Sequence, residues 1–148
     1  MHLVLVAPEI PPNTGNVARL CAATNTPLHL VRPLGFFLDD RRLRRAGLDY
    51  WTHVELRIHD SLDALWSVLP IARAYFVSTK GTIPYTQVAF AADDVLVFGS
   101  EGAGLPAPLL AAHPDRTITI PMSGPVRSLN LATAAAIVLF EGLRQQSR

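Results

Sequence analysis

Residues 118–130, ITIPMSGPVRSLN, join a predicted strand to a predicted helix and decide the fold class of the chain. The alternation over 117–120 predicts a strand that ends at Pro121, because proline has no N–H to give to a sheet ladder. We expect Ser128 to be the N-cap of the long apolar helix that follows. A polar loop between a strand end and a helix start often binds ligands in α/β proteins, and an ordinary capped junction is the alternative.

Outward from this stretch, apolar runs alternate with helical patterns along the whole chain. This alternation predicts an α/β fold with a parallel sheet flanked by helices, as a single domain over residues 1–148. The expected strands are 3–7, 28–31, 54–58, 73–78, 95–98 and 117–120. The expected helices are 16–23, capped by Asn13 or Thr14, one that starts at Asp39-Asp40, 61–69, 107–112 and one that Ser128-Leu129-Asn130 opens.

Composition excludes several classes of protein. With 148 residues, 49% of them hydrophobic, the chain is long enough and apolar enough for a core, which excludes disorder. The net charge of +1 argues neither for nor against a nucleic-acid partner. The N-terminus lacks the pattern of a signal peptide, and the longest apolar run, 131–140, is too short for a bilayer. We therefore expect no membrane association.

The cysteine and the histidines suggest neither a disulfide nor a metal site. Cys21 is the only cysteine, so no disulfide forms within the chain and a cytoplasmic setting is expected. It lies in an apolar helical pattern typical of a buried thiol. The five histidines are scattered without the spacing of metal ligands, so we predict no metal.

The loop after the first strand, PEIPPNTG, combines three prolines with polar side chains. Asn13, Asn16 and Arg19 are spaced three residues apart, so around a helix start they are expected to point to one side. This predicts either a functional cluster or a capped helix with a surface arginine.

Four arginines in five positions, Arg41, Arg42, Arg44 and Arg45, form the densest charge in the chain. They follow Asp39-Asp40, which suits the positive end of a helix dipole. A helix carrying them is either a solvated face or a patch that binds RNA phosphates.

The segment GSEGAG, residues 99–104, follows a buried strand and has the glycine content of a ligand loop. Its spacing is G-x-x-G-x-G, which differs from the dinucleotide order, and it lacks the lysine of a P-loop. What remains is Glu101, a carboxylate in a glycine-rich loop at a strand end.

The last helix is apolar nearly all round from Leu131 to Phe140. A helix without a polar stripe is buried on all sides, and a terminal helix rarely finds that much cover in a domain of this size. Its alanines would permit close approach of a second helix. We therefore predict a homodimer, with burial inside one subunit as the alternative.

Three segments together resemble the SPOUT superfamily of S-adenosylmethionine-dependent RNA methyltransferases. They are IPPNTGNVARLCAAT, LVFGSEGAGLP and IPMSGPVRSLNLATAAAIVLFE, which look like that superfamily's motifs one, two and three. GFFLDDRRLRRAGLDYW and STKG also resemble its small branch, which methylates the ribose 2′-OH of the wobble nucleotide, a cytidine or uridine, in tRNA. The resemblance spans nearly the whole chain.

The resemblance implies a SPOUT fold with a deep trefoil knot in its C-terminal part, a rare exception among unknotted chains. It implies S-adenosylmethionine as cofactor and S-adenosylhomocysteine as product, bound in the knot by three loops. The active site of the family lies at a dimer interface, here formed by the last helix and the motif-one region. The cofactor-binding residues carried over are Val77, Ser78, Gly99, Glu101, Gly102, Ile120, Met122, Ser128 and Leu129.

The resemblance also implies catalytic roles for Arg19, Asn16, Ser128 and Asn130. Arginine scarcely deprotonates in proteins, so Arg19 is expected to hold a phosphate and polarise the ribose hydroxyl while a phosphate oxygen or water takes the proton. Ala132 and Phe140 depart from the serine and tyrosine of relatives. The alternatives are a 2′-O-methyltransferase for another tRNA or rRNA position and a catalytically silent RNA-binding module.

Overall fold

The computed structural model describes residues 1–147, except for the side chains of residues 47–49. These three residues lie in GFFLDDRRLRRAGLDYW, one of the segments that resemble the SPOUT superfamily. Its described part contains one seven-stranded, all-parallel sheet in the order β3-β2-β1-β6-β4-β7-β5. The strands are β1 His2–Val6, β2 Leu28–Val31, β3 Leu56–His59, β4 Ala74–Val77, β5 Ile83–Pro84, β6 Val95–Phe98 and β7 Thr117–Thr119. The predicted parallel α/β architecture is confirmed.

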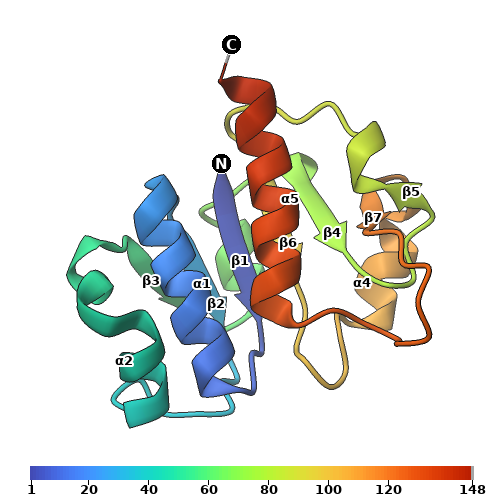
Figure 1. Cartoon of the computed structure of the whole chain (residues 1–148). Helices are drawn as coiled ribbons and strands as arrows, with labels where there is room; N and C mark the ends of the chain where they lie inside the picture. The colour runs from blue at the N-terminus through green and yellow to red at the C-terminus, as the bar shows by residue number, and fades with distance from the viewer. Residues whose placement is uncertain (148) are drawn as a thin grey trace.

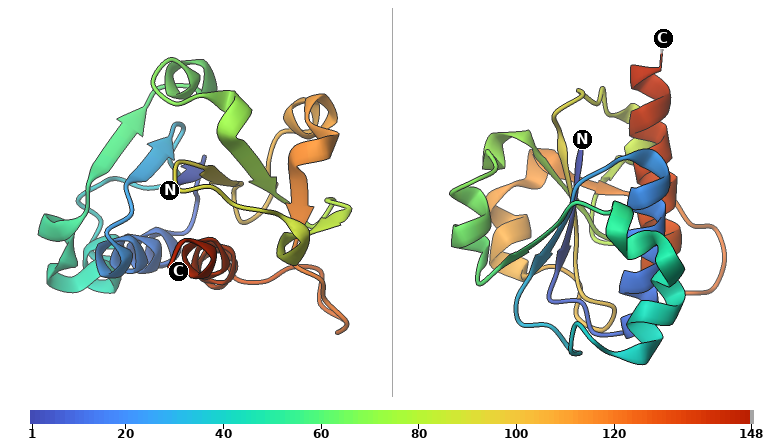
Figure 2. Two further views of the ribbon diagram at one scale, coloured as in Figure 1. Left: turned by 90° about the horizontal axis from the view of Figure 1, so that it is seen from above. Right: turned by 90° about the vertical axis from the view of Figure 1, so that its left-hand side faces the viewer.

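Helices cover both faces of this sheet. The α-helices are α1 Pro11–Thr24, α2 Arg41–Gly47, α3 Leu62–Trp66, α4 Ala107–Ala112 and α5 Leu131–Gln146. Short 3-10 turns complete the chain: η1 Leu48–His53, η2 Ile71–Arg73, η3 Tyr85–Gln87 and η4 Pro114–Arg116. Figure 2 shows α1, α2 and α5 on one face and α3 and α4 on the other.

The two faces bury separate hydrophobic clusters. Alternate residues of β1 point to opposite sides, so Leu3 and Leu5 pack under α1 and α5, whereas Val4 and Val6 pack under α3 and α4. The central strands are buried on both faces, as parallel strands are, which explains their unbroken apolar runs. Cys21 lies in the first cluster, and burial raises the pKa of its thiol to about 12, so it is an inert packing residue.

Several predicted boundaries were wrong. The first helix begins at Pro11, five residues before the predicted start, with Ile10 as the N-cap position. Proline is favoured in the first turn because its missing N–H has no partner there, so PP marks a helix start and not the end of a rigid loop. As a result Asn13 and Thr14 lie inside the helix instead of capping it.

The start of the last helix was also predicted wrongly. Its N-cap is Asn130, whose side-chain oxygen accepts the Thr133 N–H at 3.2 Å, so Ser128 belongs to the loop. The predicted six strands are seven, because the two-residue β5 is too short to leave a pattern. The predicted helix over 61–69 begins at Leu62, with Ser61 as its N-cap, and ends at Trp66.

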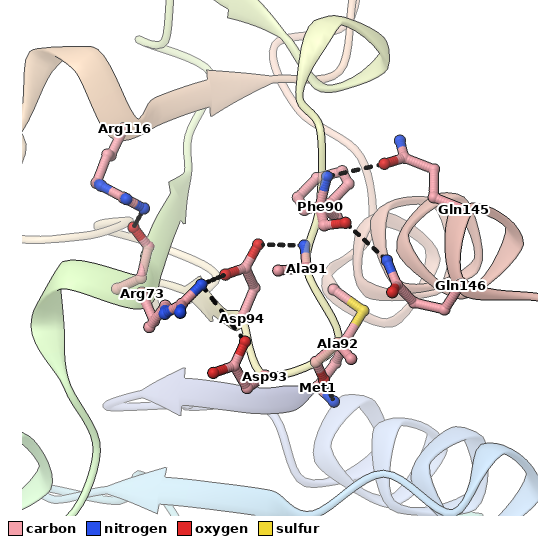
Figure 3. Close-up of polar contacts among 11 residues, drawn as sticks. Met1, Arg73, Phe90, Ala91, Ala92, Asp93, Asp94, Arg116, Gln145 and Gln146 are labelled. Atoms are coloured by element: carbon pink, nitrogen blue, oxygen red, sulfur yellow. Dashed lines mark hydrogen bonds and ion pairs between the residues drawn. The ribbon is translucent and has the colours of Figure 1, made fainter.

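The C-terminal end of α5 is clasped to the segment that leads into β6 (Figure 3). Gln145 accepts the Phe90 N–H at 2.8 Å and donates to the Val88 carbonyl at 3.0 Å, and Gln146 donates to the Phe90 carbonyl at 2.6 Å. Within the same segment, the Asp94 carboxylate accepts the Ala91 N–H at 2.8 Å and so stabilises the turn before β6. These bonds fix one end of α5 over the sheet, so its other end is held at the carboxyl edge of the strands (Figure 1).

Candidate functional site

A cavity of about 830 Å³ opens at the carboxyl ends of β4, β6 and β7. Val77, Phe98 and Thr119 line it from the strand ends, while Asn13 and Asn130 line it from the starts of α1 and α5. This edge of a parallel sheet is where ligands bind in open α/β folds. Its volume lies in the range of small-molecule and cofactor sites.

The predicted glycine loop 99–104 forms one wall of the cavity and is folded tightly on itself. A Cβ on Gly99 would lie 2.1 Å from the backbone carbon of Gly104, so only glycine fits there. The loop is closed by the Gly104 N–H, which donates to the Ser100 carbonyl at 2.9 Å, and Gly104 has a positive φ of 69°. Its glycines therefore bring backbone groups to the cavity surface.

Glu101 in this loop has a role that the sequence did not reveal. Its two carboxylate oxygens accept the backbone N–H groups of Glu9 and Ile10, each at 2.8 Å, and the Asn13 side-chain amide at 3.2 Å. A carboxylate at the positive end of a helix dipole is stabilising. Glu101 thus caps α1 from a distant loop, and its oxygens face protein donors.

Asn13 links this cap to the last helix. While its amide donates to Glu101, its carbonyl oxygen accepts the Asn130 amide at 2.9 Å. Asn130 in turn caps α5, so the starts of α1 and α5 and the glycine loop are joined by one chain of hydrogen bonds. Asn13 was predicted only as a cap or as one of a surface cluster, and the contact across 117 residues of chain leaves no local signal.

A second bond ties the same loops in the opposite direction. The Glu9 carboxylate accepts the Gly102 N–H at 3.0 Å, while Glu101 accepts the Glu9 N–H. The two loops therefore hold each other through reciprocal contacts between backbone and side chain. This fixes one side of the cavity before any ligand binds.

The opposite wall is formed by STKG, residues 78–81, which lies across β7. A Cβ on Gly81 would lie 2.7 Å from the Ile118 backbone, and the Ser78 N–H donates to the Ile118 carbonyl at 2.9 Å. Lys80, the only lysine of the chain, lines the cavity from this loop, and Arg127 lines it from the motif-three loop. Neither cation was predicted as a site residue.

All nine residues predicted to hold the cofactor line this cavity, together with Asn130. They come from four separate segments of the chain, so their convergence is a result of the fold. The nine are Val77, Ser78, Gly99, Glu101, Gly102, Ile120, Met122, Ser128 and Leu129.

Arg19 and Asn16 lie away from this cavity. Both are exposed on the outer side of α1, and the Arg19 guanidinium lies 5.1 Å above the Tyr50 ring. Asn13 is buried, so the expectation that Asn13, Asn16 and Arg19 point to one side was wrong. Because α1 starts earlier than predicted, Asn13 is already part of the helix. The turn of the helix directs its side chain to the interior, whereas Asn16 and Arg19 face outward.

The four arginines of α2 are not equivalent. Asp40 starts the helix as expected, accepting the Arg42 N–H at 2.8 Å and pairing with its guanidinium at 3.3 Å. Arg44 donates to the Leu38 carbonyl at 3.0 Å and lies over the Trp51 ring. Among the side chains that the structure describes, Arg41 and Arg45 are exposed and their guanidinium groups make no hydrogen bond or ion pair. The patch therefore has two free guanidinium groups and two that support the local structure.

The last helix is only partly covered by the rest of the chain. Leu131, Ala135, Val138 and Leu139 are buried, but Phe140 keeps 55% of its surface exposed. Thr133, Ala136, Ile137 and Phe140 recur at the spacing of one helix face, and all are exposed or half-buried. Complete burial of α5 within one chain was therefore wrong, and an apolar face stays uncovered beside the exposed side of α1.

Neither a metal centre nor a membrane span is found in the described residues. No group of three or more His, Cys, Asp or Glu side chains in that part of the chain is arranged to hold a metal ion. In the same residues no helix has both the length and the apolar character to cross a bilayer.

The fold and the loops that line the cavity are those of an RNA methylase of the SpoU class. Residues 1–140 match the model of the SpoU rRNA Methylase family, so the chain belongs to that family. The chain is 50% identical over 147 residues to the tRNA (cytidine(34)-2′-O)-methyltransferase of Burkholderia cenocepacia, covering 97% of this chain and 94% of that protein.

Solved structures agree with this assignment. One, described as giving structural insights into the 2-OH methylation of C/U34 on tRNA, has a TM-score of 0.94 at 52% identity and covers 99% of this chain and 95% of that one. The AdoMet-bound rRNA methyltransferase of Sinorhizobium meliloti has a TM-score of 0.84 at 25% identity, over 99% of this chain and 57% of that one. The recognition made from the sequence motifs is confirmed.

Proposed function

We propose that this protein transfers a methyl group from S-adenosylmethionine to the ribose 2′-OH of the wobble nucleotide, cytidine or uridine 34, of tRNA. The observation that carries the proposal is the cavity formed by the STKG loop, the glycine loop and the motif-three loop, whose lining contains every residue assigned to the cofactor. Relatives named for this reaction match the chain over nearly its full length.

The residues present fit the cofactor. The cavity of about 830 Å³ has room for an adenosyl ligand, and its glycine loop and motif-three loop present backbone groups. We assign Val77, Ser78, Gly99, Gly102 and the segment 120–129 to its binding, with Glu101 acting mainly by holding the wall. When bound, the sulfonium supplies an activated methyl group, so the chain's own task is to position the ribose oxygen in line with it.

The catalytic roles follow from side-chain chemistry. Arg19 binds the phosphate beside the target ribose and polarises its hydroxyl, because a guanidinium is always charged and donates in a fixed fork. A phosphate oxygen or a water accepts the proton. Ser128 and Asn130 orient the ribose from the cavity side, and Asn16 acts from the same helix as Arg19.

A homodimer reconciles the two groups of residues. Arg19 lies outside the cavity of its own subunit, and α1 and α5 are neighbours with uncovered faces. Packing these faces against a second copy would cover Phe140 and bring Arg19 toward the partner's cavity. We therefore propose a shared active site at a dimer interface formed by α5 and the motif-one region.

The assembly has a direct test. Light scattering at micromolar concentration should give about twice the chain mass of 16.1 kDa. Phe140→Arg should shift the mass toward the monomer without unfolding, because the side chain is exposed within one subunit and a charge is poorly tolerated in an apolar interface. Val68→Arg, at another exposed apolar position, is the matched control and should leave the dimer intact. A folded monomer of the parent chain would contradict the shared site.

The RNA is bound by the surface of the dimer. Arg41 and Arg45 are the principal phosphate ligands, with Arg42 and Arg44 adding charge to the same helix. We also propose that the chain is a single domain, that its C-terminal part forms a deep trefoil knot, and that the protein acts in the cytoplasm where tRNA is modified. The tight packing of Gly81 on β7 supports the knot.

The function is tested in two steps. Calorimetry should show binding of S-adenosylmethionine and S-adenosylhomocysteine but not of NAD, and cofactor with unmodified tRNA should yield a 2′-O-methyl at the wobble nucleotide. A methyl at another tRNA or rRNA position would keep the chemistry and change the substrate. Binding of RNA without methyl transfer would indicate a silent binding module. A folded sample that binds neither adenosyl compound would refute the proposal.

A further inference from the structure

Phe37 places a phenyl ring in solvent on an ordered backbone. The ring keeps 81% of its surface exposed, the highest value among the large exposed hydrophobic residues of the described part of the chain. The Phe37 carbonyl accepts the Asp40 N–H at 3.0 Å, and the Arg44 guanidinium holds the next carbonyl, that of Leu38, at 3.0 Å. The loop is thus fixed at both residues although the ring contacts little.

The loop that carries Phe37 is also attached to the rim of the cavity. The Gly35 N–H donates to the Pro8 carbonyl at 2.9 Å, and a Cβ on Gly35 would lie 2.7 Å from the Glu9 Cα, so only glycine permits this approach. Glu9 accepts the Gly102 N–H of the glycine loop through its side chain. A short series of contacts therefore connects Phe37 to the wall of the proposed cofactor site.

The surface that follows Phe37 in the chain is positively charged. Arg41 and Arg45 are exposed with no ion pair in the described residues, while Asp40 is paired with Arg42. Over residues 37–47 the four arginines of α2 outnumber the two carboxylates, Asp39 and Asp40, by two. A phenyl ring beside unpaired guanidinium groups is complementary to a nucleic acid, in which flat bases alternate with phosphates.

We propose that Phe37 is a stacking platform for an unpaired base of the RNA loop that carries the target nucleotide. This inference rests on the proposed function and adds a residue that recognises bases. RNA loops are recognised by stacking their exposed bases on aromatic side chains, and stacking tolerates any base. A second copy of the chain is disfavoured as the occupant, because the centres of protein interfaces are depleted in charged residues.

The test compares five variants by their affinity for an anticodon stem-loop RNA. Phe37→Ala and Phe37→Leu should each weaken binding roughly tenfold, because both lose the aromatic face, whereas Phe37→Trp should retain it. The dependence of affinity on salt should not change, since stacking releases no counterions, in contrast to Arg41→Ala/Arg45→Ala. Val68→Ala, another exposed apolar truncation, should bind as the parent does. Affinity for S-adenosylhomocysteine should be equal in all of them.

A fluorescent base analogue locates the contact. With 2-aminopurine at each loop position in turn, one position should be quenched by the parent and by Phe37→Trp but not by Phe37→Leu. If Phe37→Ala bound the stem-loop RNA as tightly as the parent, the inference would be overturned. A change in the mass of the dimer caused by Phe37→Ala would also overturn it, because the ring would then contact a second copy of the chain. If the parent fails to methylate tRNA yet binds the stem-loop in a Phe37-dependent way, the stacking site stands while the proposed reaction falls.

Discussion

Arg19→Ala should lower methyl transfer by about 100- to 1,000-fold, the cost of removing one donor from developing negative charge, while cofactor affinity stays unchanged. Cofactor affinity stays unchanged because the Arg19 guanidinium lies over Tyr50 on the outer side of α1 and does not line the cavity of its own chain. Single-turnover transfer with saturating tRNA measures the loss, and calorimetry with S-adenosylhomocysteine measures the affinity.

Arg19→Lys should rescue little of this activity, because an ammonium is a point charge that cannot reproduce a bidentate contact to phosphate. Asn16→Ala, on the same exposed side of α1, measures the weaker contribution expected from a neutral neighbour. Turnover close to normal in Arg19→Ala would remove Arg19 from the mechanism.

Subunit mixing then tests whether Arg19 acts across the dimer. Ala134 lines the cavity, so Ala134→Phe should obstruct the cofactor site while leaving Arg19 in place. Neither Arg19→Ala nor Ala134→Phe should be active alone. Random reassociation makes about half of the dimers hybrid, and a symmetric dimer has two equivalent sites, so about one quarter of the parent activity should return if each site is shared. No recovery would indicate that each subunit uses its own Arg19.

The sequence predicted the sheet and the cavity because their signals are local. Buried parallel strands are short apolar runs, and the glycine loop and the proline-ended strand mark the places where backbone approaches a ligand. Once these segments were ordered in a parallel sheet, their carboxyl ends had to meet at one edge, which is where the cavity lies.

The contacts that complete the site could not be predicted in the same way. The bond between Asn13 and Asn130 joins residues 117 positions apart, and Glu101 caps a helix in another motif. Such pairs depend on how the elements pack, and periodicity carries no information about it. The early start of α1 is different, because two consecutive prolines are a recognisable first turn.

The histidines show the same limit. They were predicted as scattered, but His2, His29 and His59 lie on the adjacent strands β1, β2 and β3 and form a continuous ladder of hydrogen bonds. A His2 ring nitrogen lies 3.1 Å from His29, whose other ring nitrogen lies 2.9 Å from His59. Strand register creates this row: His29 is paired with Val4 of β1 and Arg57 of β3, so His2 and His59, each two residues from these partners, are its diagonal neighbours on one face of the sheet.

The ladder should make the protein unstable in mild acid. Burial lowers the pKa of His29 to about 4, with further lowering by His2, His59 and Arg57. The side chain is only 2% exposed, so the folded state holds a neutral imidazole there. The unfolded chain binds its proton near the ordinary pKa of about 6.5, and so stability falls as pH decreases from about 6.5 toward about 4.

For His29 alone this linkage corresponds to a loss of about 2 kcal/mol between pH 7.5 and pH 5. Urea unfolding at constant protein concentration should show it, and His29→Gln should reduce the difference by about this amount even if that variant is less stable at both pH values. His2 and His59, whose pKa values are also lowered by burial, keep their own contributions in this window. His53→Gln, which removes an exposed histidine, is the control and should keep the full difference.

The carboxylates with a lowered pKa, Asp40 and Glu141, lose their contribution only below the ordinary range near pH 4, so they do not act in this window. An equal pH dependence in the parent and His29→Gln would show that the buried imidazole is not the group that senses the acid.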